Sequence, residues 1–256
     1  MGSDAVVPPT PERWVPRHRV VLSTYRMGAC EVTNAEYAAC MAAGLCTEPY
    51  ETRSLTRPAY FDSEEFRNFP VIAVDWGQAD VYCRWVGGRL PSEAMWEKAA
   101  RGGCELRGVA DCTAEDAVDW PWGDEEPRCD LANAAMIDER DGGSGLVACV
   151  GDPAGPGDTD RVGARPSGAS VYGVLDLVGN VWEWTSDWYD EGDDYWDLGA
   201  DPDGVRVDPE GPPSGTTKIT RGGSFGGADR IWFRGGWPPV MYPAPGGGFR
   251  CAWSGE

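Results

Sequence analysis

Glycine and proline recur along the whole chain, and their spacing leaves little room for long helices or strands. The sequence holds 35 glycines and 21 prolines among 256 residues, spread rather than clustered. Both residue types favour turns, glycine because it tolerates positive φ angles and proline because its φ angle is fixed. Thirteen tryptophans supply large apolar side chains against which an irregular backbone can pack. We therefore predict a loop-rich fold that packed aromatic side chains hold together.

Hydrophobic spacing and capping residues predict three helices. Thr33 or Asn34 caps a first helix that carries residues 35–43 and ends at a glycine. A second helix places apolar residues at helical spacing over residues 79–86 and also ends at glycines. A third helix over residues 92–101 begins at a capping serine and ends before two glycines.

Strands are predicted between these helices and after them. Residues 20–25 are strand-like, and residues 71–74 form a short buried run. Three tryptophans of one parity between residues 182 and 188 indicate a strand, and residues 216–225 alternate in the same way. Because no internal repeat, low-complexity tract or linker interrupts the chain, we predict a single domain over residues 1–256.

The charge of the chain is strongly negative, with a formal net charge of −20. Such a field repels phosphate backbones and anionic lipids, so we expect no nucleic-acid partner. It attracts cations, and calcium is one of them, although a solvated acidic surface that keeps the protein soluble accounts for the charge as well. No apolar run approaches the length that crosses a membrane, so we expect no transmembrane segment.

Nine cysteines without tight CxxC pairs indicate disulfides rather than a zinc site. An odd count leaves at least one thiol unpaired. Cys40 and Cys46 flank the end of the first helix closely enough for a short disulfide, subject to geometry. This cysteine usage predicts an exported protein, periplasmic or extracellular. The opening residues show no signal peptide, so an export signal has been removed or lies outside this chain.

Six motifs follow one another in order: EVTNAEY, GGRLPSEAMWEKAARGG, PWGDEEP, DLVGNVWEWTSDWY, RGGSF and GFRCAW. In this order and spacing they resemble the family of the formylglycine-generating enzyme, also called sulfatase-modifying factor, over nearly the full length. The resemblance implies one α+β domain over residues 1–256, a variant of the C-type lectin fold with little regular structure. Residues 1–19 would form an irregular N-terminal segment.

The resemblance also implies a disulfide from Cys83 to Cys251, which the sequence alone does not select. For the remaining cysteines we propose three pairs and leave Cys30 free. The pairs are Cys40 with Cys46, Cys104 with Cys112, and Cys129 with Cys149.

Family members that make formylglycine hold copper with two cysteines placed shortly after the RGGS motif, a ligand type that suits copper(I). Gly227 and Trp232 stand where these cysteines align, and Cys251 downstream belongs to the implied disulfide. We therefore expect no copper site and no oxidase chemistry. A related branch of iron enzymes uses a histidine cluster, and this chain has only His18, so we expect no iron site.

The segment DLVGNVWE resembles the calcium loop of the family, in which carboxylates and main-chain carbonyls surround the ion, as hard oxygen ligands suit calcium. The implied ligands are the carboxylates of Asp176 and Glu183 and the carbonyls of Gly179 and Val181. In the alternative interpretation, Asp176 and Asn180 only stabilise a tight turn.

A second calcium site of the family would begin near Asn133 and Ala134. The loop that follows departs in length from the family pattern, so its carboxylate is not assigned.

The function predicted first is a non-catalytic, calcium-stabilised module that binds a peptide, protein or small molecule through residues 226–247. Aromatic residues offer stiff apolar area there, glycines let a ligand approach the backbone, and charged residues fix orientation. The candidate contact residues are Asp229, Arg230, Trp232, Arg234, Trp237 and Tyr242. Any of the aromatic ones can instead pack inward.

Three alternatives stay open. The chain could be a formylglycine-generating oxidase or a related oxidoreductase, in which Cys30 would be the available thiol, although the neighbouring Glu31 disfavours a thiolate. It could be a partner subunit without activity of its own. It could also be a display protein whose residues between RGGS and GFR are diversified, although the composition of this tract does not favour that.

Overall fold

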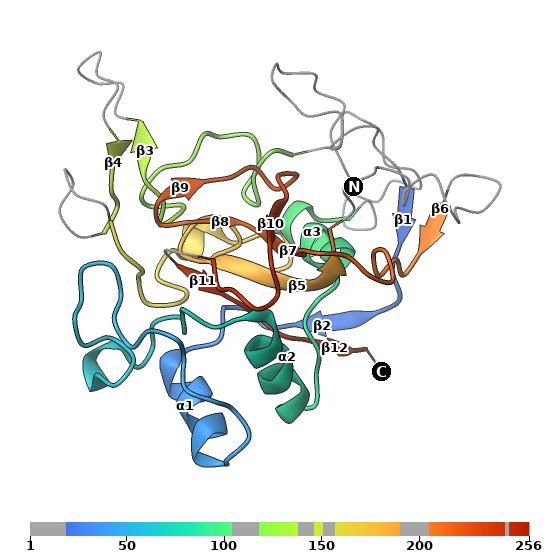
Figure 1. Ribbon diagram of the computed structural model, residues 1–256. Helices are drawn as coiled ribbons and strands as arrows, with labels where there is room; N and C mark the ends of the chain where they lie inside the picture. The colour runs from blue at the N-terminus through green and yellow to red at the C-terminus, as the bar shows by residue number, and fades with distance from the viewer. Residues whose placement is uncertain are drawn as a thin grey trace.

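The computed structural model describes residues 19–103, 118–137, 146–150, 157–189, 205–243 and 246–255 (Figure 1). The predicted pair Cys104 and Cys112 lies outside them. The α-helices are α1 (Asn34–Ala42), α2 (Trp76–Trp85) and α3 (Glu93–Arg101), and the 3₁₀-helices are η2 (Glu64–Phe66) and η5 (Pro166–Gly168).

Side-chain caps explain where the helices begin. Thr33 caps α1, because its hydroxyl accepts from the Glu36 amide at 3.2 Å while the Glu36 carboxylate accepts from the Thr33 amide at 2.8 Å. Asp75 and Gln78 form the same reciprocal box on α2, and Ser92 caps α3. The three predicted helices are confirmed within one to three residues.

The central sheet has the strand order β10, β7, β5, β11. These strands are β10 (Gly235–Trp237), β7 (Lys218–Arg221), β5 (Trp182–Trp188) and β11 (Gly247–Gly248). Strand β7 is antiparallel to both β5 and β10, and β11 runs parallel to β5. Figure 1 shows α1 and α2 below this sheet and the hairpin of β8 (Gly223–Ser224) and β9 (Gly227–Ala228) above it.

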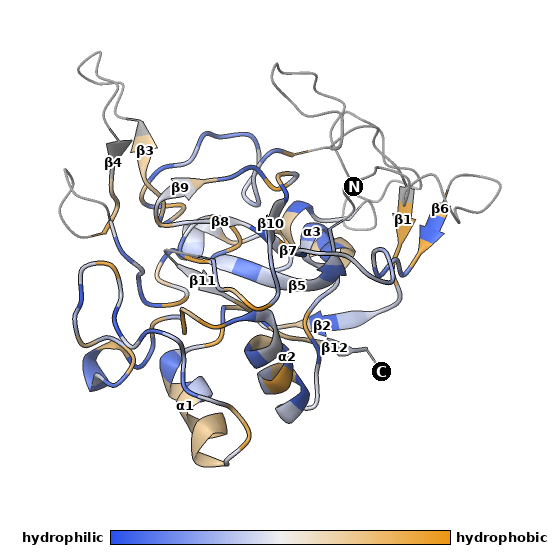
Figure 2. Cartoon of the chain, in the orientation of Figure 1, coloured by the Kyte–Doolittle hydropathy of each residue, from blue (hydrophilic) through white to orange (hydrophobic). Residues whose placement is uncertain are grey.

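Short strand pairs surround the central sheet. Strand β1 (Arg19–Val21) pairs with β6 (Val205–Val207), β2 (Tyr25–Met27) with β12 (Ala252–Ser254), and β3 (Met136–Ile137) with β4 (Leu146–Val147). The predicted strand at 20–25 is therefore two strands. The first of them begins at Arg19, which the prediction had placed in an irregular N-terminal segment, and residues 1–18 of that segment lie outside the described part. Figure 2 shows apolar residues in β1, where Val21 is 45% exposed.

Two large buried clusters form most of the core, and a third, smaller one is built from Tyr60, Ile72 and Val181. The first joins α1 and α2 to β5 through side chains that include Tyr37, Tyr82 and Trp184. The second joins α3 to the loops around it through Trp96, Leu177 and other apolar residues. The predicted buried run at 71–74 is confirmed, but it forms no strand.

The predicted strand at 182–188 is confirmed as β5, and it is buried on both faces. Residues that alternate with its tryptophans are also buried because each finds a polar partner. Glu183 pairs with Arg250, the Thr185 hydroxyl donates to the Ile219 carbonyl, and Asp187 accepts from the Glu93 amide. A register shift between Trp184 and Trp188 further disturbs the alternation.

Three predicted disulfides are confirmed: Cys40–Cys46, Cys83–Cys251 and Cys129–Cys149. Cys30 is free, as expected. The second disulfide ties α2 to the residue before β12. Disulfides of this number are typical of proteins that fold in an oxidising compartment.

Among the described residues, no helix has both the length and the apolar character needed to cross a membrane.

Candidate functional site

The RGGS motif ends β7 and fixes the segment that follows it. Arg221, which is fully buried, donates to the Glu97 carboxylate at 2.7 Å and to the carbonyls of Ile231 and Phe233 at 2.5 and 2.8 Å. A buried guanidinium is stabilised when a carboxylate and several acceptors surround it. Arg221 therefore positions the chain on the far side of the β8–β9 hairpin.

The two glycines of the motif make the turn possible. Gly222 and Gly223 have φ angles of 92° and 74°, which side chains rarely allow. A Cβ atom at Gly223 would lie 2.6 Å from the Gly227 carbonyl oxygen and 3.0 Å from Asp229 Oδ2. Asp229 therefore lies so close to Gly223 that a side chain at position 223 would clash with it.

The six predicted contact residues do not form one continuous surface. Asp229, Arg230 and Trp232 lie near the loop that contains Asp119. Arg230 Nη1 is 2.6 Å from Asp119 Oδ2, and Trp232 Nε1 donates to Asp119 Oδ1 at 3.3 Å. Their side chains are partly buried. We call Asp119, Trp120, Trp122, Arg230 and Trp232 the aromatic–acidic cluster.

Two of the predicted contact residues face the interior instead. Arg234 binds both carboxylate oxygens of Glu93, at 2.6 and 2.8 Å, and its side chain is 9% exposed. The reason is electrostatic, since the buried Glu93 needs a cation. Trp237 packs against the first core cluster. Arg234 is therefore structural rather than a surface contact.

The aromatic–acidic cluster contains Trp122 of the PWGDEEP motif and the two residues before that motif, Asp119 and Trp120, none of which was predicted as a contact residue. Trp120 and Trp122 stack with ring centroids 5.9 Å apart and an interplanar angle of 2°. The Arg230 guanidinium lies over Trp120, 5.7 Å from its centroid. The buried indole Nε1 of Trp120 has no hydrogen-bond partner in the described part of the chain. The tryptophans around the PWG segment are the signal that could have found this cluster.

Tyr242, the sixth predicted residue, belongs to a separate exposed surface. It stacks on Tyr50 with centroids 5.5 Å apart, and the Tyr50 hydroxyl donates to Asp75 Oδ2 at 2.9 Å. Val240 is 75% exposed, Met241 50% and Tyr50 57%. We call Tyr50, Val240, Met241 and Tyr242 the exposed tip. Tyr50 was missed because the sequence around it is polar and irregular.

The exposed tip is anchored by backbone hydrogen bonds. The Trp76 amide donates to the Pro239 carbonyl at 3.3 Å, and the Met241 amide donates to the Pro238 carbonyl at 3.0 Å. The Tyr50 amide donates to the Ala73 carbonyl at 2.8 Å. These bonds hold apolar side chains toward solvent in a defined arrangement.

No thiol lies at Gly227 or Trp232, the two positions that the family resemblance aligns with copper ligands. Gly227 sits in β9, and Trp232 donates to Asp119 as described above. Cys30 is the free cysteine among the described residues. Burial, and then the carboxylates of Asp176 and Glu31, raise the pKa of its thiol to about 11. At neutral pH the Cys30 thiol is therefore protonated and a weak nucleophile.

The loop predicted to bind calcium is tightly wound and tied to distant segments. Asp176, Gly179 and Asn180 have φ angles of 57°, 80° and 56°. Asn180 Oδ1 accepts from the Asp160 amide at 2.8 Å, and its Nδ2 donates to Glu31 Oε1 at 3.0 Å. These bonds agree with a structural role of Asn180 in the turn. Calcium binding would therefore depend on the other oxygen donors of the loop.

Glu183 does not fit as a calcium ligand in this arrangement. Its two carboxylate oxygens accept from Arg250 at 2.6 Å each, and Oε2 also accepts from Trp96 Nε1 at 2.8 Å. Asp176 lies in the loop, and the buried Glu31 faces it through its hydrogen bond with Asn180. Burial and the nearby Asp176 raise the pKa of Glu31 well above its usual range.

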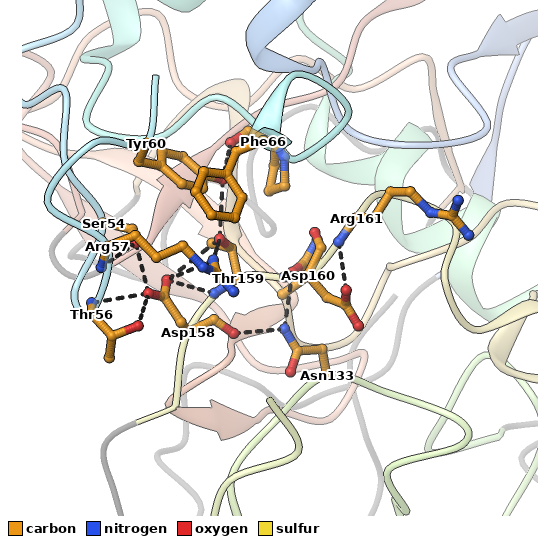
Figure 3. Close-up of polar contacts among 12 residues, drawn as sticks. Ser54, Thr56, Arg57, Tyr60, Phe66, Asn133, Asp158, Thr159, Asp160 and Arg161 are labelled. Atoms are coloured by element: carbon orange, nitrogen blue, oxygen red, sulfur yellow. Dashed lines mark hydrogen bonds and ion pairs between the residues drawn. The ribbon is translucent and has the colours of Figure 1, made fainter. Parts of the chain in front are cut away.

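The donors predicted for a second calcium site are engaged in a polar network (Figure 3). Asn133 Nδ2 donates to the Asp158 carbonyl at 3.0 Å, and the Asn133 carbonyl accepts from the Asn180 amide at 2.7 Å. The Asp158 carboxylate accepts hydrogen bonds from the Ser54 hydroxyl at 2.6 Å and from the amide and hydroxyl of Thr56. Ala134 is fully buried.

In the described ranges, no group of three or more histidine, cysteine or acidic side chains is placed to share a metal ion. A calcium site at the loop would therefore use at most two carboxylates, with other oxygen donors.

The ordered motifs, the RGGS turn and the loop-rich α+β fold define a domain of the kind found in formylglycine-generating enzymes. The chain matches the sulfatase-modifying factor enzyme 1-like domain over residues 1–255, and it belongs to this family.

Curated relatives include enzymes. The formylglycine-generating enzyme of Thermomonospora curvata is 36% identical over 164 residues, which cover 62% of this chain and 45% of that protein. The hercynine oxygenase of Mycolicibacterium smegmatis is 32% identical over 208 residues, covering 73% of this chain and 42% of that protein. The chain thus spans less than half the length of these relatives.

Solved structures share the fold. PvdO from Pseudomonas aeruginosa has a TM-score of 0.68 at 23% identity, covering 98% of this chain and 89% of that chain. Treponema denticola variable protein 1 has a TM-score of 0.62 at 22% identity, covering 93% and 87%. At these identities the likeness concerns the fold alone.

Proposed function

We propose that this chain is a non-catalytic binding domain that holds a peptide or protein through residues 226–247, chiefly at the exposed tip. One observation carries the proposal: Val240 and Met241 are 75% and 50% exposed on a backbone that hydrogen bonds hold in place. Exposed apolar side chains on a backbone that is already ordered cost less entropy to bind than those on an unordered segment, so they favour a contact surface.

The aromatic–acidic cluster supports the same proposal at the other end of the segment. It offers stacked indoles, a guanidinium and the Asp119 carboxylate, which are the groups that orient a polar ligand. Asp229 lies beside it, and burial raises the pKa of its carboxyl to about 6.

The non-catalytic part of the proposal is supported by the residues at positions 227 and 232 and by the protonated thiol of Cys30. The enzymes among the relatives favour the alternative, an oxidase that converts a substrate cysteine to formylglycine, and this alternative needs a separate assay.

We also propose that calcium stabilises the fold at the Asp176 loop. The charge of −20 and two neighbouring carboxylates, the buried Glu31 and the partly buried Asp176, support a divalent cation there. Export from the cytoplasm remains part of the proposal, supported by the disulfides.

The binding proposal is tested with a phage-displayed library of random peptides, selected on the purified domain in calcium. Enriched peptides are then measured by fluorescence anisotropy. The double substitution Val240→Ser and Met241→Ser should weaken their binding at least about tenfold, as expected for the loss of two apolar contacts. Val207→Ser, at a valine of β6 that is 66% exposed, is the matched control. Equal binding by the double variant and the control contradicts the assignment of the tip.

The purified domain is also used to test for oxidase activity. The domain is loaded with copper(I) and incubated with a cysteine-containing peptide under oxygen, and mass spectrometry follows the cysteine. We expect no formylglycine. Conversion that depends on added copper would replace the proposal by the oxidase alternative.

A further inference from the structure

Asp229 is a partly buried carboxylate at the RGGS turn, and it has neither a hydrogen bond nor an ion pair with any residue that the structure describes. Burial alone raises the pKa of this carboxyl to about 6, and no described cation lies close enough to lower it. At neutral pH the carboxylate is therefore mostly ionised in a place that is partly shielded from water. A charge in such a place is stabilised by an opposite charge that hydrogen-bonds to it.

The guanidinium that follows Asp229 in sequence is bound elsewhere. Arg230 Nη1 lies 2.6 Å from Asp119 Oδ2, and Arg230 Nη2 lies 3.4 Å from Glu126 Oε1. The Ile231 amide also donates to the Asp119 carbonyl, at 3.2 Å. These contacts hold the segment after Asp229 against the loop that contains Asp119, so Arg230 does not neutralise Asp229.

A main-chain oxygen lies close to the free carboxylate. A Cβ atom built on Gly223 would be 3.0 Å from Asp229 Oδ2 and 2.6 Å from the Gly227 carbonyl oxygen, so both oxygens lie on the same side of the RGGS turn. Gly227 itself has open space where a side chain would stand, because a Cβ atom there meets no described heavy atom within 4 Å, chain neighbours aside. A carboxylate and a carbonyl placed together suit an ammonium group, which has three N–H donors and no acceptor.

The loop next to this turn carries an excess of negative charge. Between residues 119 and 130 it holds five carboxylates and one guanidinium: Asp119, Asp124, Glu125, Glu126 and Asp130 against Arg128. Arg230 adds one more positive charge and leaves the balance negative. Such a surface attracts cationic ligands and repels acidic ones. Charge complementarity therefore favours a basic ligand.

We infer that the ligand of the aromatic–acidic cluster is a basic peptide, and that the Asp229 carboxylate and the Gly227 carbonyl bind the ammonium group of one of its lysines. This inference rests on the proposed function and names the ligand class at this end of the segment. The apolar stem of a lysine packs well on aromatic rings, and the partly exposed Trp122 offers one in the cluster. The compact ammonium suits two acceptors better than the rigid, planar fork of arginine does.

The experiment uses small probes of known structure. N-acetyl-lysinamide and N-acetyl-norleucinamide share a four-carbon stem and differ in the ammonium group, and N-acetyl-argininamide carries a guanidinium instead. Each probe is titrated at constant ionic strength into the full chain and into its Asp229→Asn variant, and tryptophan emission follows binding. Asp62→Asn, at an exposed carboxylate, is the matched control.

We expect the unsubstituted chain and Asp62→Asn to bind the lysine probe at least about tenfold more tightly than the norleucine probe, as for a hydrogen bond between charged groups. The arginine probe should bind more weakly than the lysine probe. Asp229→Asn should lose most of the preference for lysine. Its unfolding temperature at neutral pH should be no lower than that of the unsubstituted chain, because the substitution removes an unpaired charge, whereas a structural role of Asp229 would lower it.

Three results overturn the inference. They are equal affinities of the unsubstituted chain for the lysine and norleucine probes, a preference for lysine that Asp229→Asn retains, and tighter binding of the arginine probe than of the lysine probe. None of them affects the peptide selection at the exposed tip, so the proposed function would stand. If that selection yields no peptide whose binding depends on Val240 and Met241, the proposed function fails separately, and the lysine probe still decides about Asp229.

Discussion

Arg250 and Glu183 form a bidentate ion pair inside the fold, with both side chains fully buried and two nitrogen–oxygen distances of 2.6 Å. The pair joins β5 to the residue that precedes Cys251, and it also explains why Glu183 is unavailable to a metal. Since the partner charge would be left buried, removal of one member should be strongly destabilising.

We predict that Glu183→Gln lowers the free energy of unfolding by about 3 kcal/mol, the magnitude typical of a broken buried pair. Urea denaturation with EGTA measures the change without a contribution from calcium. Glu210→Gln is the control, because Glu210 pairs with Arg89 at 3.0 Å on an exposed surface, where a loss of less than about 1 kcal/mol is expected. Equal losses in the two variants would contradict a dominant role of the buried pair.

The RGGS turn yields a second prediction, from two glycines of one hairpin. Gly223→Ala should destabilise the protein by about 1 to 3 kcal/mol, because its φ angle is 74° and the new Cβ would meet the Gly227 carbonyl at 2.6 Å. Gly227→Ala should cost less, since an added Cβ meets no described heavy atom within 4 Å, chain neighbours aside. Thermal unfolding of both variants checks the order, and the reverse order would contradict the turn geometry.

The pH dependence of stability yields a third prediction, centred on Asp187. Burial, and then the Glu93 carboxylate, raise the pKa of Asp187 from 3.8 to about 7. Because the folded state then binds more protons than the unfolded chain between these values, the free energy of unfolding falls as the pH rises through this window. We predict a smaller fall for Asp187→Asn, by about 1 to 3 kcal/mol, since one pKa unit corresponds to about 1.4 kcal/mol.

Denaturation in urea at about pH 4.5 and pH 7.5 measures this fall, a window set by the shifted pKa. Asp229, whose pKa burial raises to about 6, contributes in the same direction to both proteins. Asp62→Asn, at an exposed carboxylate, is the control. If the free energy of unfolding falls equally with pH in Asp187→Asn, in the control and in the unsubstituted chain, Asp187 does not cause the pH dependence.

The helices were predictable because their signals are local. The Thr33 and Asp75 caps lie within three residues of their partners, and the glycines that end each helix follow in sequence. The Cys83–Cys251 disulfide spans 168 residues, and only the family resemblance selected it. No local pattern encodes such an approach.

The candidate site was less predictable for the same physical reason. Glu31 and Asn180 are 149 residues apart in sequence, and Glu93 and Arg234 are 141 apart. Whether a charged side chain faces solvent or an interior partner depends on which segments the fold brings together. Arg234 therefore looked like a surface contact in the sequence, while Tyr50, which completes the exposed tip, carried no signal at all.

The positions that lack the copper ligands yield the last prediction. The double substitution Gly227→Cys and Trp232→Cys should create a copper(I) site, because the resemblance aligns these positions with the family's cysteine pair and thiolates suit copper(I). Gly227 has open space for a side chain, whereas the loss of Trp232 removes its bond to Asp119, so a lower unfolding temperature is expected. Competition with a copper(I) chelator measures the affinity. Gly227→Cys alone supplies one thiolate and is the control. If the double variant binds copper(I) no more tightly than this control, the two positions are misaligned with the family's pair. The oxidase alternative would then regain support.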